Sequence, residues 1–89
     1  MQRGKWLKYS HVLVIEDDII LCQFIKRKLD KIGINCRIVT SGKIGLQQAL
    51  TDQYSLIILD VNLPEYNGLE ILEEIRRQNV STPAIVTTI

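Results

Sequence analysis

The chain has 89 residues, enough for one small domain, and 46% of them are hydrophobic, as in ordinary globular proteins. Its 11 basic and 10 acidic residues nearly cancel, which argues against direct nucleic-acid binding. Apolar runs are too short to span a membrane and no secretory signal opens the chain, so we expect a reducing, cytoplasmic location. We interpret residues 1–10 as a basic leader and residues 11–89 as the domain.

The first predicted strand covers about residues 11–16 and leads into a helix. Asp17 and Asp18 begin that helix, because carboxylates are favoured where backbone N–H groups lack partners. Gly33 is predicted to end it. The two cysteines, Cys22 and Cys36, are interpreted as buried small hydrophobes. The predicted core stripe of the helix contains four apolar residues: Leu21, Ile25, Leu29 and Ile32.

The rest of the chain continues the alternation of strands and helices. Such alternation predicts βαβ units with right-handed crossovers, and therefore an α/β fold built on a parallel sheet. The expected elements are a strand over 35–40, a helix from Ser41 through about Asp52, a strand over Leu56–Asp60, a helix from Asn67-Gly68 to about Gln78, and a strand over Ala84–Ile89.

Two of these strands end in acidic residues. Asp60 closes the apolar strand Leu56–Asp60, and the first strand runs directly into Glu16 and Asp17. Adjacent parallel strands would bring these carboxylates to one edge of the sheet, where α/β proteins bind ligands. Crowded carboxylates repel one another, and a divalent cation with a preference for oxygen, Mg²⁺ or Mn²⁺, would relieve the repulsion. Structural roles as helix caps or turn residues remain the alternative.

Together these segments resemble the receiver domain of two-component response regulators, from Val12 to Thr88. The resemblance rests on the acidic motif Glu16-Asp17-Asp18, on Ser41-Gly42 with Leu46, on Leu56–Pro64 followed by Asn67-Gly68, and on Thr88 at a strand end. It implies a flavodoxin-like three-layer α/β/α fold with the strand order 2-1-3-4-5 known for this family. Gly45 departs from the pattern, because alanine is common there.

The resemblance also implies a chemistry for the acidic edge. Asp60 would accept a phosphoryl group from the phosphohistidine of a sensor histidine kinase, in a phosphorelay that commonly regulates transcription. Asp17 and Asp60 would bind Mg²⁺ directly, Glu16 through water and Asn62 through its backbone carbonyl. Thr88 would stabilise the phosphoryl group, and Asn62 would position the water that later removes it.

The family pattern continues past Ile89 through a fourth helix, a fifth strand with a conserved lysine, and a fifth helix. We therefore interpret the chain as the N-terminal, incomplete part of a receiver domain. Without the lysine, phosphorylation of Asp60 by a small phosphodonor is expected to be slow or undetectable. The strand Ala84–Ile89 would form an exposed edge, which predicts a homodimer or higher oligomer through this strand or the bare sheet face.

Two other functions compete with the phosphoacceptor. A truncated receiver would serve only as a protein-interaction module, without turnover of phosphate. An aspartyl-phosphate phosphatase would be an enzyme, but such enzymes carry a second acid two residues after the nucleophile, where this chain has Asn62. We therefore expect a phosphoacceptor and not an enzyme.

Overall fold

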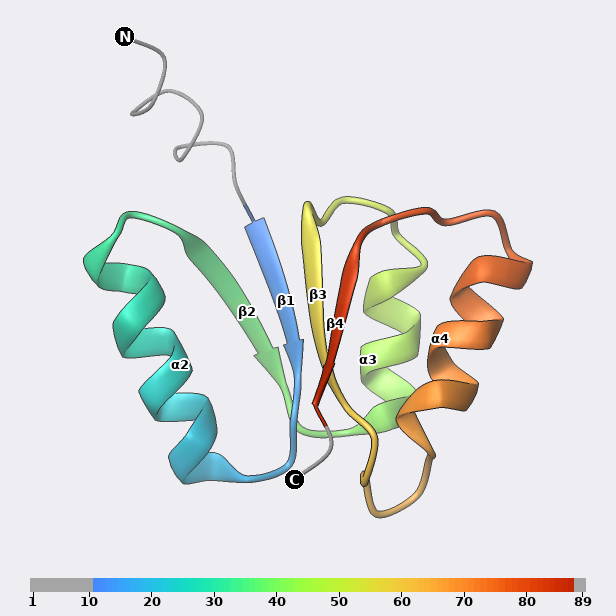
Figure 1. The fold of residues 1–89 in the computed structure, drawn as a ribbon, viewed down its shortest axis with the longest axis horizontal. Helices are drawn as coiled ribbons and strands as arrows, with labels where there is room; N and C mark the ends of the chain where they lie inside the picture. Colours follow the sequence, from blue (N-terminus) through green and yellow to red (C-terminus); the bar gives the residue numbers. More distant parts are fainter. Residues whose placement is uncertain (1–10, 88–89) are drawn as a thin grey trace, which may run out of the picture.

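The computed structural model describes residues 11–87 and shows strands and helices in strict alternation (Figure 1). The four strands form one parallel sheet in the order β2-β1-β3-β4, which confirms the predicted α/β class. The leader at residues 1–10 lies outside the described residues. The elements are β1 (His11–Ile15), α2 (Ile19–Lys31), β2 (Asn35–Val39), α3 (Gly42–Ala49), β3 (Leu56–Asp60), α4 (Gly68–Arg77) and β4 (Ala84–Thr87).

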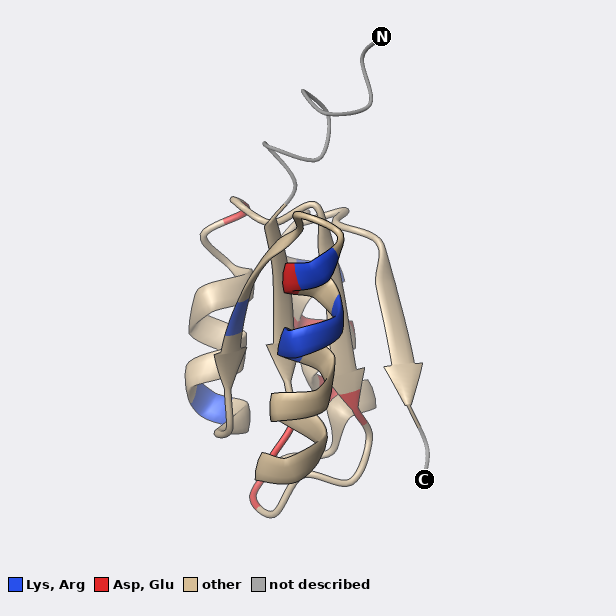
Figure 2. Ribbon diagram, turned by 90° about the vertical axis from the view of Figure 1, so that its left-hand side faces the viewer, with Lys and Arg blue, Asp and Glu red and all other residues tan. Residues whose placement is uncertain are grey.

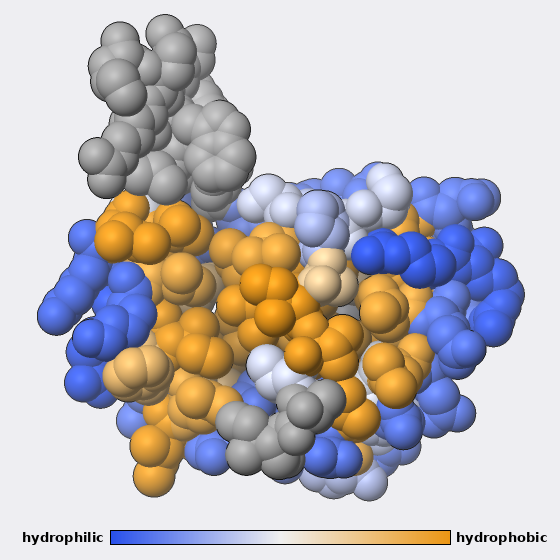
Figure 3. All heavy atoms as spheres, in the orientation of Figure 1, coloured by the Kyte–Doolittle hydropathy of each residue, from blue (hydrophilic) through white to orange (hydrophobic). Residues whose placement is uncertain are grey.

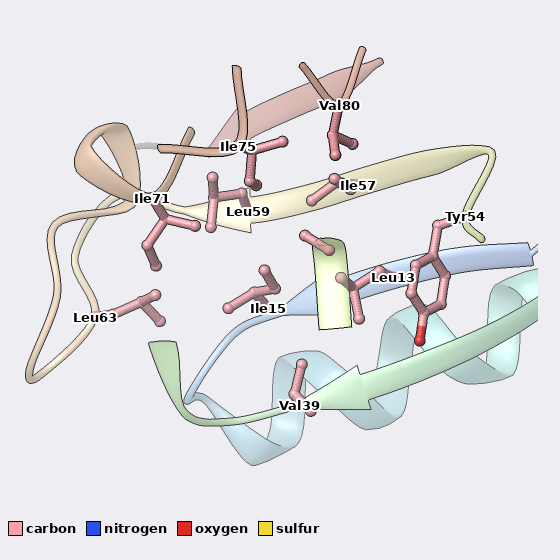
Figure 4. Close-up of a cluster of buried hydrophobic side chains, with 11 residues drawn as sticks. Leu13, Ile15, Val39, Tyr54, Ile57, Leu59, Leu63, Ile71, Ile75 and Val80 are labelled. Carbon is pink, nitrogen blue, oxygen red and sulfur yellow. The ribbon is translucent and has the colours of Figure 1, made fainter. Parts of the chain in front are cut away.

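The sheet lies between two helical layers, with α2 on one face and α3 and α4 on the other (Figure 1). All strands point the same way, so their carboxyl ends meet at one edge of the sheet. β1 is covered on both faces: Leu13 and Ile15 face the α3 and α4 layer (Figure 4), while Val12 and Val14 are buried on the opposite face. This arrangement is the flavodoxin-like three-layer fold predicted from the sequence.

Helix α2 begins and ends where the sequence places its signals. Asp18 is the N-cap, and its Oδ1 accepts the backbone N–H groups of Ile20 and Leu21 at 3.0 and 3.2 Å. Gly33 follows the helix with a φ of 77°, and the N–H of Ile34 donates to the Leu29 carbonyl at 3.0 Å. A residue in this left-handed conformation ends the helix, which confirms the end predicted from Gly33 in the sequence.

The predicted core stripe of α2 is wrong at one end. Ile32 is the C-cap residue, beyond the last helical residue Lys31, and is 54% exposed. Cys22 is instead the buried residue of this helix, while Cys36 on β2 is half-buried. The prediction of two buried cysteines therefore holds fully only for Cys22. The other three stripe residues, Leu21, Ile25 and Leu29, are half-buried.

Helix α3 ends at Ala49, three residues before the predicted end at Asp52. The Thr51 hydroxyl donates to the carbonyl of Gln48 at 2.6 Å, and Asp52 adopts a φ of 57°. A side chain that binds the helix's last carbonyls, followed by a left-handed residue, stops the helix. The amphipathic sequence pattern of this helix continues past Ala49, so the pattern did not predict where α3 ends.

Gly45 packs directly against the end of β1. A Cβ atom at this position would lie 2.7 Å from the Cδ1 and Cγ2 atoms of Ile15, which is fully buried. The missing methyl group on α3 therefore makes room for the large side chain that immediately precedes Glu16. This contact gives a physical reason for the glycine that departs from the family pattern.

We predict that Gly45→Ala destabilises the protein by about 1–3 kcal/mol, because it overpacks a filled core. Adding Ile15→Val removes Cδ1 and should reduce that cost, so the two substitutions are coupled. Urea unfolding of the four variants measures the coupling. Gln47→Ala, at an exposed position of α3, is the control and should change stability by less than about 0.5 kcal/mol. Equal costs of Gly45→Ala in both backgrounds would show that the contact with Cδ1 is not the source of the cost.

Candidate functional site

The acidic residues lie at the carboxyl ends of two neighbouring strands. β1 and β3 pair directly, with Ile15 opposite Leu59, so the next residues on the two strands are Glu16 and Asp60. The backbone N–H of Glu16 donates to the Val39 carbonyl at 3.1 Å, which ties this end of β1 to β2. The parallel register therefore brings the two acids together.

Three carboxylates form one cluster at this edge. Oxygen atoms of Glu16, Asp17 and Asp60 all lie within 4.8 Å of one another. They border a pocket of about 240 Å³, and the described residues that line it include no lysine or arginine. The lining residues are Glu16, Asp17, Asp18, Leu21, Asp60, Asn62 and Thr87. A pocket with this lining attracts cations.

Backbone N–H groups hold two of the carboxylates in place. Glu16 Oε2 accepts the N–H of Asp18 at 3.1 Å, and Asp60 Oδ1 accepts the N–H of Asn62 at 3.1 Å. The thiol of Cys22 donates to the Glu16 carbonyl at 3.2 Å, which fixes the backbone of the acidic turn to α2. These contacts orient the acids, but none of them neutralises their charge.

The loop after Asp60 returns tightly to the strand that it leaves. Asn67 is the N-cap of α4, and the N–H of Gly68 donates to the Val61 carbonyl at 2.9 Å. A Cβ atom at Gly68 would lie 2.2 Å from the Asp60 carbonyl oxygen. Only glycine allows this approach, so Gly68 keeps the start of α4 beside Asp60.

The pKa of Glu16 is raised above its ordinary value. Burial is the main cause, because only 7% of the residue is exposed, and the nearby Asp60 adds to the shift. The hydrogen bond from the Asp18 N–H opposes it. Burial first, and then the charge of Asp60, thus make ionisation of Glu16 costly when no cation is bound.

The donor set fits a small divalent cation that prefers oxygen ligands. Three carboxylates from two strand ends converge within reach of one ion, with oxygen atoms that all lie within 4.8 Å of one another. Carboxylate oxygens are the ligands that Mg²⁺ and Mn²⁺ prefer. In the described residues this is the one group of three or more such side chains with this geometry.

Most residues that the sequence singled out lie at this pocket. Glu16, Asp17, Asp60 and Asn62 line it together, and Asp18 lines it while serving as a helix cap. Thr88, the predicted hydroxyl, lies outside the described residues. Its neighbour Thr87, which pairs with Asp60 in the sheet, lines the pocket and was missed. The sequence analysis extended this strand to Ile89 and assigned the hydroxyl role to Thr88. It therefore gave no reason to single out Thr87, which pairs with Asp60.

Comparison with known proteins agrees with this fold. Residues 12–89 match the family described as response regulator receiver domain. The chain is 44% identical over 79 residues to the response regulator ArlR of Staphylococcus saprophyticus and 42% identical to that of Staphylococcus aureus. These matches cover 89% of the chain but 36% of each relative, so the chain spans about a third of their length.

Solved structures show the same fold. The receiver domain of the Francisella response regulator 1452 superposes with a TM-score of 0.84 at 35% identity, over 89% of this chain and 65% of that one. The receiver domain of the Arabidopsis thaliana histidine kinase CKI1, solved in complex with Mg²⁺ and BeF₃⁻, gives a TM-score of 0.82 at 28% identity over 98% of this chain and 70% of that one. The fold and the acidic edge define a receiver domain, and the chain belongs to the response regulator receiver family.

Across residues 11–87, none of the helices has both the length and the apolar character needed to cross a membrane.

We predict that Glu16→Gln stabilises the protein at pH 7 in the absence of divalent cations. Because burial raises the pKa of Glu16, its ionisation removes stability as the pH rises from the ordinary value of 4.5 through the higher folded value. The glutamine avoids that loss and still accepts the Asp18 N–H. Urea unfolding in a chelating buffer should show a gain at pH 7 that disappears below pH 4.5.

The control is Glu73→Gln on the exposed face of α4, which should leave stability within about 0.5 kcal/mol at both pH values. A gain from Glu16→Gln that is the same at low and neutral pH would show that ionisation is not its cause.

Proposed function

We propose that residues 11–89 act as the N-terminal part of a receiver domain whose phosphoacceptor is Asp60. The observation that carries this proposal is the position of Asp60, at the end of β3 in a pocket shared with two further carboxylates. The donor is the phosphohistidine of a sensor histidine kinase, the partner of this family, and the proposed place of action is the cytoplasm.

Asp60 performs the chemical step. One of its carboxylate oxygens attacks phosphorus, the nitrogen–phosphorus bond of the donor breaks, and the imidazole leaves with the electron pair and takes up a proton. The product is an acyl phosphate on Asp60. The Asn62 N–H, 3.1 Å from Asp60 Oδ1, orients the carboxylate for this attack. The side chain of Asn62 is proposed to position the water that hydrolyses the product.

Mg²⁺ or Mn²⁺ would be held by the acidic cluster. Asp17 and Asp60 are the proposed direct ligands, Glu16 acts through water, and the backbone carbonyl of Asn62 completes the protein's share. When bound, the ion neutralises charge on the carboxylates and on the incoming phosphoryl oxygens. Thr88 is proposed to donate its hydroxyl to the same oxygens. Thr87, the residue before it in the sequence, lines the pocket.

The surface next to the pocket suits a protein partner. Ile19, Ile20 and Phe24 on the first turns of α2 are 55%, 79% and 51% exposed, and Leu21 between them lines the pocket. Figure 2 shows that the basic residues of α2 lie on the half of the helix farther from the acidic edge. We place the kinase on this apolar surface, since the donor must bring its phosphohistidine to Asp60.

The competing functions have less support. A receiver that only docks a partner would use the same apolar surface of α2, and it would not need the carboxylate of Asp60. A phosphatase of this kind would need a second acid two residues after Asp60 in the sequence, but Asn62 occupies that position. The proposed role is therefore a phosphoacceptor and not an enzyme.

We predict that Mg²⁺ binds at the acidic cluster and that Asp17→Asn weakens binding by at least roughly tenfold. Loss of groups that merely support metal ligands costs about 10–100-fold, and a direct ligand should cost no less. Titration followed by amide chemical shifts of residues 16–21 and 60–62 measures the affinity. Asp30→Asn is the control, because Asp30 is an exposed acid paired with Lys26 at 3.3 Å farther along α2. Unchanged affinity in Asp17→Asn would place the ion elsewhere.

We predict that beryllofluoride, which mimics a phosphoryl group, binds Asp60 in the presence of Mg²⁺. The expected result is a set of amide shifts around Asp60 and Thr87 that is lost in Asp60→Asn, because the mimic needs the carboxylate oxygen. Asp52→Asn is the control, since Asp52 follows α3 and is not among the residues that line the pocket. Shifts that persist in Asp60→Asn would refute the assignment.

A further inference from the structure

Cys22 is a buried group to which the proposed function gives no role. Its side chain lies where α2 meets β2, beside Ile19 and Ile38, and only 4% of the residue is exposed. Figure 3 shows hydrophobic residues along the side of α2 that faces the sheet and hydrophilic ones on its outer side. Cys22 is not among the residues that line the acidic pocket. Any effect of its thiol on the proposed ion must therefore act through another residue.

Two hydrogen bonds from Cys22 hold the acidic turn at both of its ends. The backbone N–H of Cys22 donates to the Asp18 carbonyl at 2.9 Å, and its thiol donates to the Glu16 carbonyl at 3.2 Å. One residue of α2 thus binds the first and the last residue of the segment 16–18, with Asp17 between them. The first bond is an ordinary helix bond, which any residue except proline would make. The second bond depends on the side chain.

The thiol fixes the side of Glu16 that the sheet does not. The backbone N–H of Glu16 donates to the Val39 carbonyl at 3.1 Å, so β2 holds the other backbone group of this buried residue. A buried carbonyl without a donor costs free energy, and an apolar neighbourhood supplies no donor of its own. Burial raises the pKa of the Cys22 thiol above its ordinary value, so the thiol keeps the proton that it donates. The bond therefore fixes the direction in which the chain leaves β1 toward Asp17.

We propose that Cys22 is a positioning residue for the acidic cluster and that its thiol raises the affinity of this edge for Mg²⁺. The inference rests on the metal site of the proposed function. Oxygen atoms of Glu16 and Asp17 lie within 4.8 Å of each other and of an Asp60 oxygen. Like charges at this distance repel, which favours an open turn unless contacts to the backbone hold it closed. A turn that is fixed before the ion arrives spares the complex the cost of ordering its ligands.

Titration of the 89-residue protein with Mg²⁺, followed by the amide shifts of residues 16–21 and 60–62, tests the role of the thiol. Cys22→Ala removes the donor and should weaken binding by roughly 3–10-fold, the range expected for one modest hydrogen bond to a supporting group. Cys22→Ser keeps a donor and should stay within about twofold of the unmodified protein. Cys36→Ala is the matched control and should leave the affinity unchanged, because this half-buried cysteine of β2 is not among the residues that line the pocket.

The affinities also separate the hydrogen bond from packing and from stability. Unchanged affinity in Cys22→Ala would overturn the proposal, and so would an equal loss in Cys22→Ser, since packing and not the donor would then be the cause. Val80→Ala removes buried atoms beside Ile57, near the amino end of β3 (Figure 4), and should lower stability without changing the affinity. A loss as large in Val80→Ala as in Cys22→Ala would also overturn the proposal, because general destabilisation would explain both.

Hydrogen exchange without divalent cations distinguishes failure of this proposal from failure of the metal site. The Asp18 N–H donates to Glu16 Oε2 across the turn at 3.1 Å, so it should exchange faster in Cys22→Ala than in Cys22→Ser or the unmodified protein. Faster exchange of this amide in a protein that binds no Mg²⁺ would support the positioning role and refute the metal site. Equal exchange in all three forms would overturn the positioning role, whatever the affinity for Mg²⁺.

Discussion

The direct pairing of β1 with β3 is the constraint on which the site depends. Their register runs from Val12 opposite Leu56 to Ile15 opposite Leu59, and it places Glu16 next to Asp60. A shift by one residue would turn every buried side chain of a strand to the wrong face of the sheet. The apolar core therefore fixes the strand ends, and the strand ends hold like charges together against their repulsion.

The acidic edge accepts an electrostatic cost that the surrounding backbone only partly offsets. N–H groups of Asp18 and Asn62 bind Glu16 and Asp60, and α2 begins at the same edge with its N-terminal N–H groups. Helix N-termini favour negative charge, so this edge suits both carboxylates and a phosphoryl group. The raised pKa of Glu16 records the part of the cost that remains. Binding sites commonly keep such locally unfavourable arrangements, which a ligand relieves.

Much of this protein was predictable from the sequence, because the signals involved are local. The alternation of strand and helix patterns predicted the α/β class, and the signals at Asp18 and Gly33 marked the two ends of α2. The apolar run Leu56–Asp60 predicted a buried strand with an acid at its end. Each inference depends on side-chain period, capping or φ preference within a few residues of the position concerned.

Tertiary structure decided the features that depend on contacts between distant segments. The hydrogen bond from the Cys22 thiol to the Glu16 carbonyl, the exposure of Ile32 and the place of Thr87 in the pocket follow from how elements pack, which no local pattern reports. Gly45 is explained only by its contact with Ile15, which lies on a different element, because a Cβ atom at position 45 would overlap the Ile15 side chain. By itself the sequence determined which residues prefer strand, helix or turn and which acids end strands. The packed sheet alone decided how closely those acids meet, because burial and distance are properties of pairs of surfaces and not of single segments.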